Sequence, residues 1–278
     1  MRVLETIEDL RAWRECISGT LGFVPTMGYL HEGHLALVRR ARVENDHLAV
    51  SIFVNPRQFG PNEDLARYPR DIARDLALLE KIGVDVVFAP TVDEMYPPGF
   101  TTTVDVGSLG ERLEGEMRPG HFRGVATVVA RLLHVFRATR AYFGQKDAQQ
   151  VAVVRRMVED LALPVEIVAV PTVRDFDGLA LSSRNIYLSA EERAAALAIP
   201  RGLARALSVF EAGEHDAERL RRIVRDSCGM EQLIRVDYVS VADAGSLVEL
   251  ILVDRAAVLL VAAWVGRTRL IDNVALSM

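Results

Sequence analysis

Two histidines stand in the segment of the chain that offers the most chemistry. His31 and His34 belong to Pro25–His34, PTMGYLHEGH, between an apolar run and an amphipathic one. In a helical turn, residues three apart share a face, and the N–H groups at a helix start favour an anion. Gly28 and Gly33 let the backbone approach a ligand closely. Imidazole donors there would stabilise the charge that grows during attack at phosphorus, so the segment favours nucleotidyl transfer.

Other interpretations of this pair compete with nucleotidyl transfer. The spacing of His31 and His34 is one residue short of the zinc-protease pattern H-E-x-x-H, which excludes that class of site. A different metal site is open, although no third His or Cys ligand is apparent. A purely structural helix cap is also open.

A strand-to-helix junction supplies a second candidate segment, Phe143–Asp147, FGQKD. Lys146 is well placed to meet phosphates, and Asp147 can accept a ribose hydroxyl or help a magnesium ion. The alternative is a surface turn whose Asp147 caps the next helix. Taken alone, the segment favours that simpler alternative.

A polar loop, Asp177–Asn185, surrounds Arg184 with small and hydroxyl residues and a possible Gly hinge. It resembles the mobile KMSKS loop of class I aminoacyl-tRNA synthetases and nucleotidylyltransferases, whose basic residue closes over the triphosphate. The pattern ending in His34 resembles the His-x-Gly-His element of the same superfamily. The alternative for the loop is a solvated linker between domains.

Two glutamines are candidates for holding a hydroxylated acid, since an amide both donates and accepts hydrogen bonds. Gln58 lies just after an apolar strand, and Gln150 lies on the helix that follows Lys146. The alternative for each is ordinary surface polarity. Their shared position near strand ends favours the binding role.

The elements that must position these residues alternate short apolar strands with helices as far as Pro171. This pattern is typical of a parallel α/β sheet covered on both faces, with ligands beyond the carboxyl ends of its strands. The expected strands are Leu21–Val24, Leu48–Val54, Val84–Phe88, Ala141–Phe143 and Val165–Val170. The expected helices are Ile7–Ile17, Leu35–Glu44, Asp71–Ile82, Val125–Phe136 and Ala148–Leu161.

After Pro171 the alternation of short apolar strands and helices ends. Ala-rich helices are expected at Ala190–Phe210 and Ala217–Ser227, followed by strands at Arg235–Val241, Ala257–Ala262 and Thr268–Ile271. We therefore predict a parallel-sheet α/β domain over residues 1–172 and a smaller α+β domain over residues 173–278.

Composition narrows the class of protein. The 278-residue chain has a net charge of -5, which disfavours general nucleic-acid binding and a tRNA-binding role. Cys16 and Cys228 form no zinc or disulfide framework. The N-terminus lacks the features of a signal peptide, and the most apolar run, Ala256–Val265, is too short to span a bilayer. We therefore expect a cytoplasmic protein with no membrane partner.

Taken together, several ordered stretches resemble the pantothenate synthetases, the pantoate–β-alanine ligase family. The likeness runs almost end to end and is dense from Val24 to Leu188. The stretches that carry it are Val24–Gly28, His31–His34, Ser51–Pro56, Tyr68–Arg70, Arg118–Val125, Gly178–Asn185, Val261–Trp264 and Leu270–Asn273.

The resemblance implies an ATP-dependent ligase acting in two steps. Pantoate would attack Mg-ATP to give pantoyl-adenylate and pyrophosphate, and β-alanine would then displace AMP to leave pantothenate. It also implies a Rossmann-like domain with a HIGH-type nucleotidyl-transfer site, a smaller C-terminal lid and a homodimer. Small departures exist: Tyr29 stands where a smaller or amide residue is usual, Gln145 stands where Glu is usual, and Arg74 precedes Asp75 where some members carry another acid.

The resemblance also implies a set of site residues. His34, credited as proton donor, His31, Lys146 and Arg184 would be catalytic, Gln58 and Gln150 would grip pantoate, and Asp75 is the candidate magnesium ligand. Tyr68, Arg118 and Arg123 would lie near the pocket. The residues implied to contact ATP are Met27, Gly28, Tyr29, Leu30, His31, Glu32, Gly33, His34, Gly144, Gln145, Lys146, Asp147, Val173, Leu181, Ser182, Ser183 and Arg184.

Two other functions compete with the ligase. A nucleotidylyltransferase would join a phosphate, rather than a carboxylate, to the nucleotide. A nucleotide-binding sensor on the same fold would bind ATP without turnover.

Overall fold

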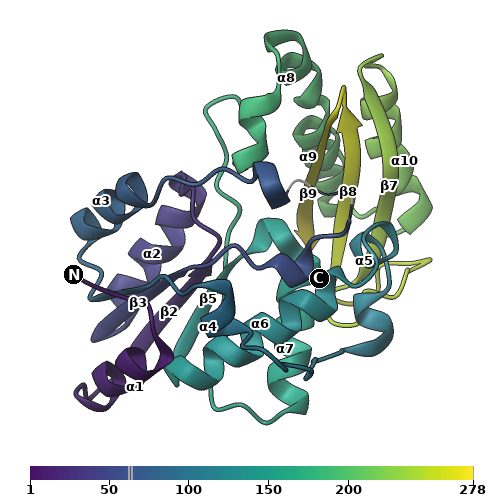
Figure 1. Cartoon of the computed structure of the whole chain (residues 1–278). Coiled ribbons are helices and arrows are strands. Elements are labelled where there is room, and N and C mark those ends of the chain that lie inside the picture. Colours follow the sequence, from purple (N-terminus) through teal and green to yellow (C-terminus); the bar gives the residue numbers. More distant parts are fainter. Residues whose placement is uncertain (62, 64, 278) are drawn as a thin grey trace. The chain divides into compact units, whose positions relative to one another are not determined.

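Six apolar strands form one parallel sheet in the order β1-β4-β3-β2-β5-β6 (Figure 1). The computed structural model describes residues 1–61, 63 and 65–277. The sheet belongs to the first of two compact units, Met1–Gly144 with Gln149–Val170. The strands are β1 (Arg2–Leu4), β2 (Leu21–Thr26), β3 (His47–Ile52), β4 (Val86–Phe88), β5 (Arg140–Gly144) and β6 (Glu166–Val170). The expected α/β class with a parallel sheet is confirmed.

The order in which strands are added to the sheet reverses at β2, which makes β2 the topological switch point. That strand pairs with β3 on one side and with β5 on the other, while β4 and β6 lie further out. In an open parallel sheet, the crevice at such a switch point is where ligands bind, beyond the carboxyl ends of the strands. The segments that follow β2 and β3 carry His31 and Gln58, and they begin at the carboxyl ends of these two strands.

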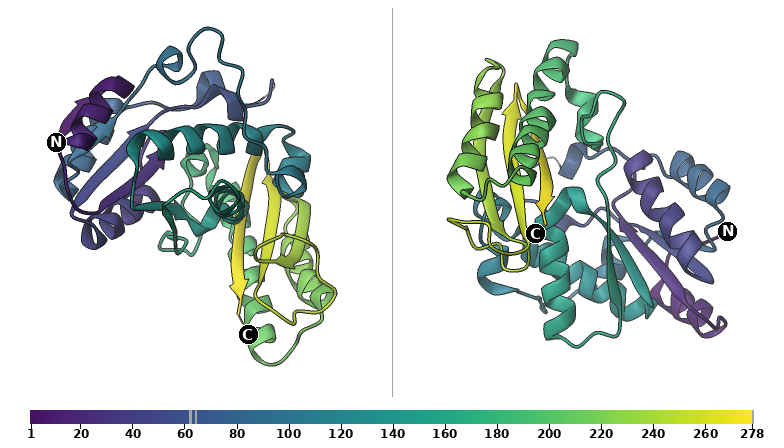
Figure 2. Two further views of the ribbon diagram at one scale, coloured as in Figure 1. Left: turned by 90° about the horizontal axis from the view of Figure 1, so that it is seen from below. Right: turned by 180° about the vertical axis from the view of Figure 1, so that it is seen from behind.

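Helices cover both faces of the sheet (Figures 1 and 2). On one face, α2 (Glu32–Glu44) and α3 (Ile72–Ile82) bury Leu35, Val38 and Leu79 in a shared core with strand residues. On the other face, Phe136 of α6 stacks on Phe23 with ring centroids 4.1 Å apart. The remaining helices of this unit are α1 (Ile7–Glu15), α4 (Val92–Met95), α5 (Glu114–Met117), α6 (His121–Phe136) and α7 (Ala148–Asp160, Ala148 itself belonging to the second unit).

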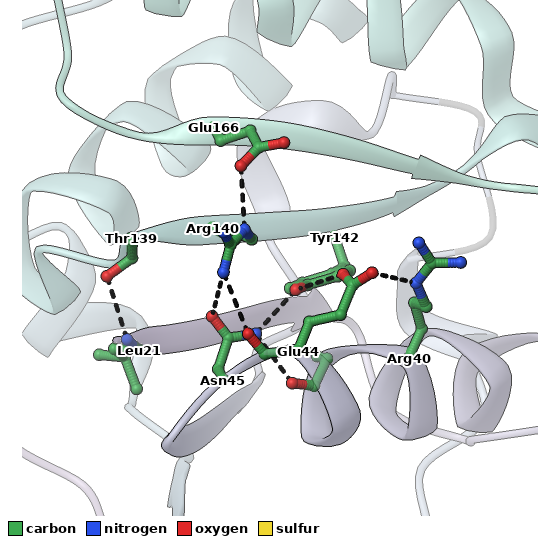
Figure 3. A network of polar contacts seen from close by, with 9 residues as sticks. Leu21, Arg40, Glu44, Asn45, Thr139, Arg140, Tyr142 and Glu166 are labelled. Atoms are coloured by element: carbon green, nitrogen blue, oxygen red, sulfur yellow. Dashed lines mark hydrogen bonds and ion pairs between the residues drawn. The ribbon is translucent and has the colours of Figure 1, made fainter. Parts of the chain in front are cut away.

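A polar network ties β5 to the end of α2 (Figure 3). The Tyr142 hydroxyl accepts a hydrogen bond from Asn45 Nδ2 at 2.7 Å and donates to Glu44 Oε2 at 2.9 Å. Arg140 donates to the Glu44 carbonyl at 3.0 Å and to Glu166 of β6 at 2.9 Å. Tyr142 is fully buried, so these bonds satisfy the hydrogen-bonding groups of its hydroxyl. They also fix the position of β5 against the end of α2.

Element boundaries differ from the expectations at several points. Helix α2 begins at Glu32, three residues before the predicted start, so His34 lies in its first turn. Helix α6 begins at His121, four residues early. The edge strand β1 was missed because it has only three residues, of which Arg2 and Val3 are exposed to solvent. Asp71 caps α3, and Gly83 ends it with a φ of 82°, a left-handed conformation typical of a glycine at the C-terminal end of a helix.

The second unit, Gln145–Ala148 with Pro171–Met278, is built on a three-stranded antiparallel sheet in the order β7-β8-β9. Helices α9 and α10 lie on one face of this sheet (Figures 1 and 2). The elements are α8 (Ala190–Ala196), α9 (Ala198–Glu211), α10 (Ala217–Gly229), β7 (Ile234–Asp243), β8 (Ala257–Val265) and β9 (Thr268–Leu276).

The single helix expected over Ala190–Phe210 was wrong. The structure divides it into α8 and α9 at Leu197. Pro200 explains the break, because a proline has no N–H to donate and its ring clashes with the carbonyl four residues earlier, here that of Ala196.

Within the described part of the chain, no helix is long and apolar enough to cross a membrane.

Candidate active site

A buried carboxylate holds the turn that follows β2. Gly28 and Tyr29 have φ values of 82° and 51°, the left-handed region that a residue with a side chain rarely adopts. Asp75, 1% exposed, accepts the Tyr29 N–H at 2.7 Å and the Leu30 N–H at 2.8 Å, one on each oxygen. Burial raises the pKa of Asp75, and the two N–H bonds oppose that rise. The contact fixes the entry into α2 from a helix 45 residues away in the chain.

The two histidines cap the helix that this turn begins. His31 is the N-cap of α2, and its Nδ1 accepts the Gly33 N–H at 3.1 Å. His34, at the third helical position, accepts the His31 N–H on its Nδ1 at 3.4 Å. This reciprocal arrangement is a capping box in which imidazoles replace the usual hydroxyl and carboxylate. The structural cap considered as an alternative is therefore present.

Capping is compatible with a chemical role, because both capping hydrogen bonds are accepted by Nδ1. A nitrogen that accepts a hydrogen bond carries no proton, so a neutral ring bonded in this way carries its proton on Nε2. Both rings then have an Nε2–H donor, and their centroids lie 4.1 Å apart. Two adjacent donors at a helix N-terminus are suited to the oxygens of a phosphate group.

A chain of hydrogen bonds fixes which way the Gln58 amide points. Gln58 ends the short 3-10 turn η1 (Pro56–Gln58) after β3, and its Oε1 accepts a bond from Asn55 Nδ2 at 3.0 Å. Asn55 is held in this orientation because its Oδ1 accepts the Tyr96 hydroxyl at 2.8 Å. Burial raises the pKa of Tyr96 to about 12, so its hydroxyl remains a donor. Gln58 Nε2, 3.3 Å from Met27 Sδ, is thereby the end of the amide turned toward the β2 segment.

A half-buried histidine, His121, supports the same turn. Only a protonated nitrogen can donate to the Gln58 carbonyl, so His121 Nδ1, 2.8 Å away, carries the proton. Its Nε2 then accepts from Arg118 at 3.2 Å. Burial, together with the charge of Arg118, lowers the pKa of His121 to about 4, so the ring is neutral near neutral pH.

The residues expected near the pocket have identifiable contacts. Arg118 pairs with Glu63, and Arg123 pairs with Asp105 at 2.6 Å. Tyr68 is buried edge-on against Phe59, with centroids 5.9 Å apart. Gln150 is half-buried in the first turn of α7, where its neighbour Gln149 binds backbone groups around Glu114.

In the second unit, Lys146 lies in the 3-10 turn η4 (Gln145–Asp147), which follows Gly144 at the end of β5. Its side chain is 19% exposed, and its Nζ lies 3.9 Å from Asp147 Oδ1. The Leu181 N–H donates to the Val173 carbonyl at 3.0 Å and closes the loop between them. The loop therefore carries Val173 and Leu181 side by side.

The arginine of the KMSKS-like loop also lies in a defined turn. Ser182 caps the 3-10 turn η5 (Ser183–Tyr187), and its hydroxyl accepts the Arg184 N–H at 3.3 Å. Asn185 Nδ2 donates to the Ala180 carbonyl at 3.0 Å. The segment predicted to close over phosphates is thus an ordered turn rather than an extended linker.

The sequence predicted that Met27, His31 and Gln58 follow strand ends near one phosphate site. The structure places their segments after the adjacent parallel strands β2 and β3. It missed the supporting roles of Asn55, Tyr96 and His121. Asn55 had a usable signal, since an Asn-Pro step directly after a buried strand marks a capped turn. Across the described residues, no three His, Cys, Asp or Glu side chains form a metal site.

Comparison with known proteins adds an independent observation. A family model described as pantoate-β-alanine ligase matches residues 2–275. Pantothenate synthetase from Roseiflexus sp. (strain RS-1) is 60% identical over 273 residues, 98% of each chain. The crystal structure of pantothenate synthetase from Thermus thermophilus covers all of both chains with a TM-score of 0.95 and 51% identity. That of pantoate-β-alanine ligase from Francisella tularensis, complexed with βγ-ATP and β-alanine, has a TM-score of 0.80 and 33% identity over 99% of this chain and 97% of that one.

Proposed function

The chain belongs to the pantoate–β-alanine ligase family, and we propose that it works through a pantoyl-adenylate. It catalyses the ATP-dependent condensation of pantoate with β-alanine. In the first proposed step, a pantoate carboxylate oxygen attacks the α-phosphorus and pyrophosphate leaves. The β-alanine amine then attacks the acyl carbon, and AMP leaves with the electrons of the acyl–oxygen bond. Membership of the family decides against the nucleotidylyltransferase and the sensor.

The observation that carries this mechanism is the pair of histidines at the start of α2 whose Nδ1 atoms accept backbone N–H groups, which assigns their protons to Nε2. ATP and the attacking carboxylate are both anions, so the site must offset their repulsion. The carboxylate is already ionised at neutral pH and needs no base. We therefore propose that His31 and His34 stabilise the charge on the α-phosphoryl group, with His34 as the donor closest to the reaction.

The remaining roles follow the same proposal. Gly144 to Asp147 would hold the ribose and phosphates, the Val173 backbone would face adenine, and Leu181 to Arg184 would close over the phosphates and exclude water from the adenylate. Mg²⁺ would enter with ATP, held mainly by phosphate oxygens and water. Asp75 is a poor magnesium ligand in this arrangement, because both of its oxygens already accept backbone N–H groups.

For Gln58→Ala we expect the KM for pantoate to rise about tenfold, while the KM for ATP stays within about twofold. The Asn55 bond directs the Gln58 amide donor toward the Met27 segment, where it would bind an oxygen of the acid. Initial rates at varied pantoate and saturating ATP measure the change. Gln232→Ala, an exposed amide elsewhere, is the matched control. An unaltered pantoate KM would remove Gln58 from the pantoate site.

Product analysis by mass spectrometry tests the reaction itself. With ATP, Mg²⁺, pantoate and β-alanine together, we expect pantothenate, AMP and pyrophosphate in equal amounts. Omitting β-alanine should still leave pantoate-dependent exchange of label between pyrophosphate and ATP. Formation of ADP and phosphate instead would rule out the adenylate route.

We also propose that the chain acts in the cytoplasm as a homodimer. The location rests on the free thiols of Cys16 and Cys228, and the dimer rests on the family resemblance. Light scattering coupled to gel filtration would measure the mass of the particle.

A further inference from the structure

Strand β9 carries two buried polar side chains that the proposed reaction does not use. Asp272 and Asn273 are 3% and 4% exposed, on the strand that pairs with β8 (Figure 1). Successive side chains of a strand point to opposite faces. Asp272 therefore shares a face with Leu270 and Leu276, which belong to the hydrophobic core, and Asn273 points to the other face. Burying polar groups is costly unless they are bonded, so their partners indicate their purpose.

Asn273 binds the backbone of the turn that carries Lys146. Its Nδ2 donates to the Gln145 carbonyl at 3.0 Å and to the Lys146 carbonyl at 2.9 Å. Only an NH₂ group can donate to two carbonyls, which settles the orientation of the amide. Its Oδ1 is buried and has no hydrogen-bond partner among the described residues. The hydrogen bonds of this side chain are therefore those of its two donors.

Asp272 binds the loop that carries Val173 and Leu181. Its carboxylate accepts both terminal nitrogens of Arg174, at 2.6 and 3.0 Å. Arg174 also donates to the Gly178 carbonyl at 3.2 Å. The Asn273 N–H donates to Asp272 Oδ1 at 2.8 Å, which links the two braces.

We infer that Asp272 and Asn273 are positioning residues that hold two nucleotide-contacting segments from a single strand. The inference rests on the proposed function of Lys146 and of the loop from Val173 to Leu181. Neither brace is proposed to touch substrate. A shift of the η4 backbone by about 1 Å would move the Lys146 ammonium group out of reach of its phosphate oxygen, and displacements of that size cost about 10²-fold in rate.

The test uses Asn273→Asp, which keeps the shape of the side chain and places carboxylate oxygens against two carbonyl oxygens. We expect the Kd for MgATP, measured by calorimetry, to rise about tenfold or more, and pantoate-dependent exchange to fall about 10²-fold. Asn273→Ser, which keeps one donor, should fall between this variant and the wild type. Removing Asp272 would leave the half-buried Arg174 charge without its carboxylate, so a loss of activity could come from that charge, and the variant is less informative.

Val274→Ala is the matched control, because it removes apolar contacts from the same strand without touching η4. Thermal unfolding of each variant shows whether the losses of stability are comparable. If Asn273→Asp binds MgATP as Val274→Ala does at similar stability, the positioning role is wrong. Calorimetry with ATP does not depend on the acid that is joined, so failure to form pantothenate would overturn the proposed function separately.

Discussion

For His34→Ala we expect a folded protein that forms the adenylate about 10²- to 10³-fold more slowly than the wild type, the loss typical of removing one transition-state donor. The reason is the placement of its ring, whose Nδ1 caps the helix and whose Nε2 then carries a proton at the mouth of α2. Pantoate-dependent exchange of labelled pyrophosphate into ATP measures this step without β-alanine. The KM for pantoate should change little, because the lost interaction is made in the transition state.

Controls separate chemistry from capping. His34→Gln places a residue typical of a capping box at the same position, so it should recover stability but not the rate. His134→Ala removes an exposed imidazole at the far end of α6 and should behave as wild type. Near-normal exchange by His34→Ala would remove His34 from the mechanism.

For Asp75→Asn we expect a fall in kcat of about 10²-fold, together with a loss of about 1–3 kcal/mol in the free energy of unfolding. A carboxamide has one oxygen, so its NH₂ group would face the N–H of either Tyr29 or Leu30. Tyr29 holds a left-handed φ of 51°, a strained conformation that the carboxylate stabilises. Once released, the turn should move both histidines. Urea unfolding and steady-state kinetics measure the two effects.

Asp71→Asn is the matched control, since it makes the same chemical change four residues away on the same helix. Asp71 is the exposed N-cap of α3, and asparagine is as good a cap, so neither quantity should change. The activity of Asp75→Asn measured over a series of Mg²⁺ concentrations shows whether Asp75 supports the turn or binds the metal ion. Recovery of Asp75→Asn activity at high Mg²⁺ would show that Asp75 binds the ion.

Much of the fold could be predicted because its signals are local. Short apolar runs predicted all of the described strands except β1, and the helix expected over Asp71–Ile82 agrees with α3 to within one residue. The boundaries that failed have local reasons as well. The start of α2 was placed late because its cap is a histidine, which is not among the usual capping residues. The break at Leu197 follows from Pro200, because the proline ring clashes with the Ala196 carbonyl four residues upstream.

The supporting residues of the site could not be predicted in the same way. Asn55 and Tyr96 are 41 residues apart, and Asn273 is 128 residues from Gln145. Nothing in the neighbourhood of Tyr96 or Asn273 indicates a partner. Their roles depend on which atoms the packed chain brings within hydrogen-bond distance.

The sequence by itself determined the class of fold, the family and the residues whose types can perform the chemistry, because periodicity and motifs are properties of neighbouring residues. The tertiary structure alone decided which nitrogen of His34 accepts a hydrogen bond, which end of the Gln58 amide donates, and that Asp75 is buried against two backbone N–H groups. The physical reason is that the direction of a hydrogen bond is set by the partner on the other side. In this protein those partners come from helices, turns and strands, and several of them are distant in the chain.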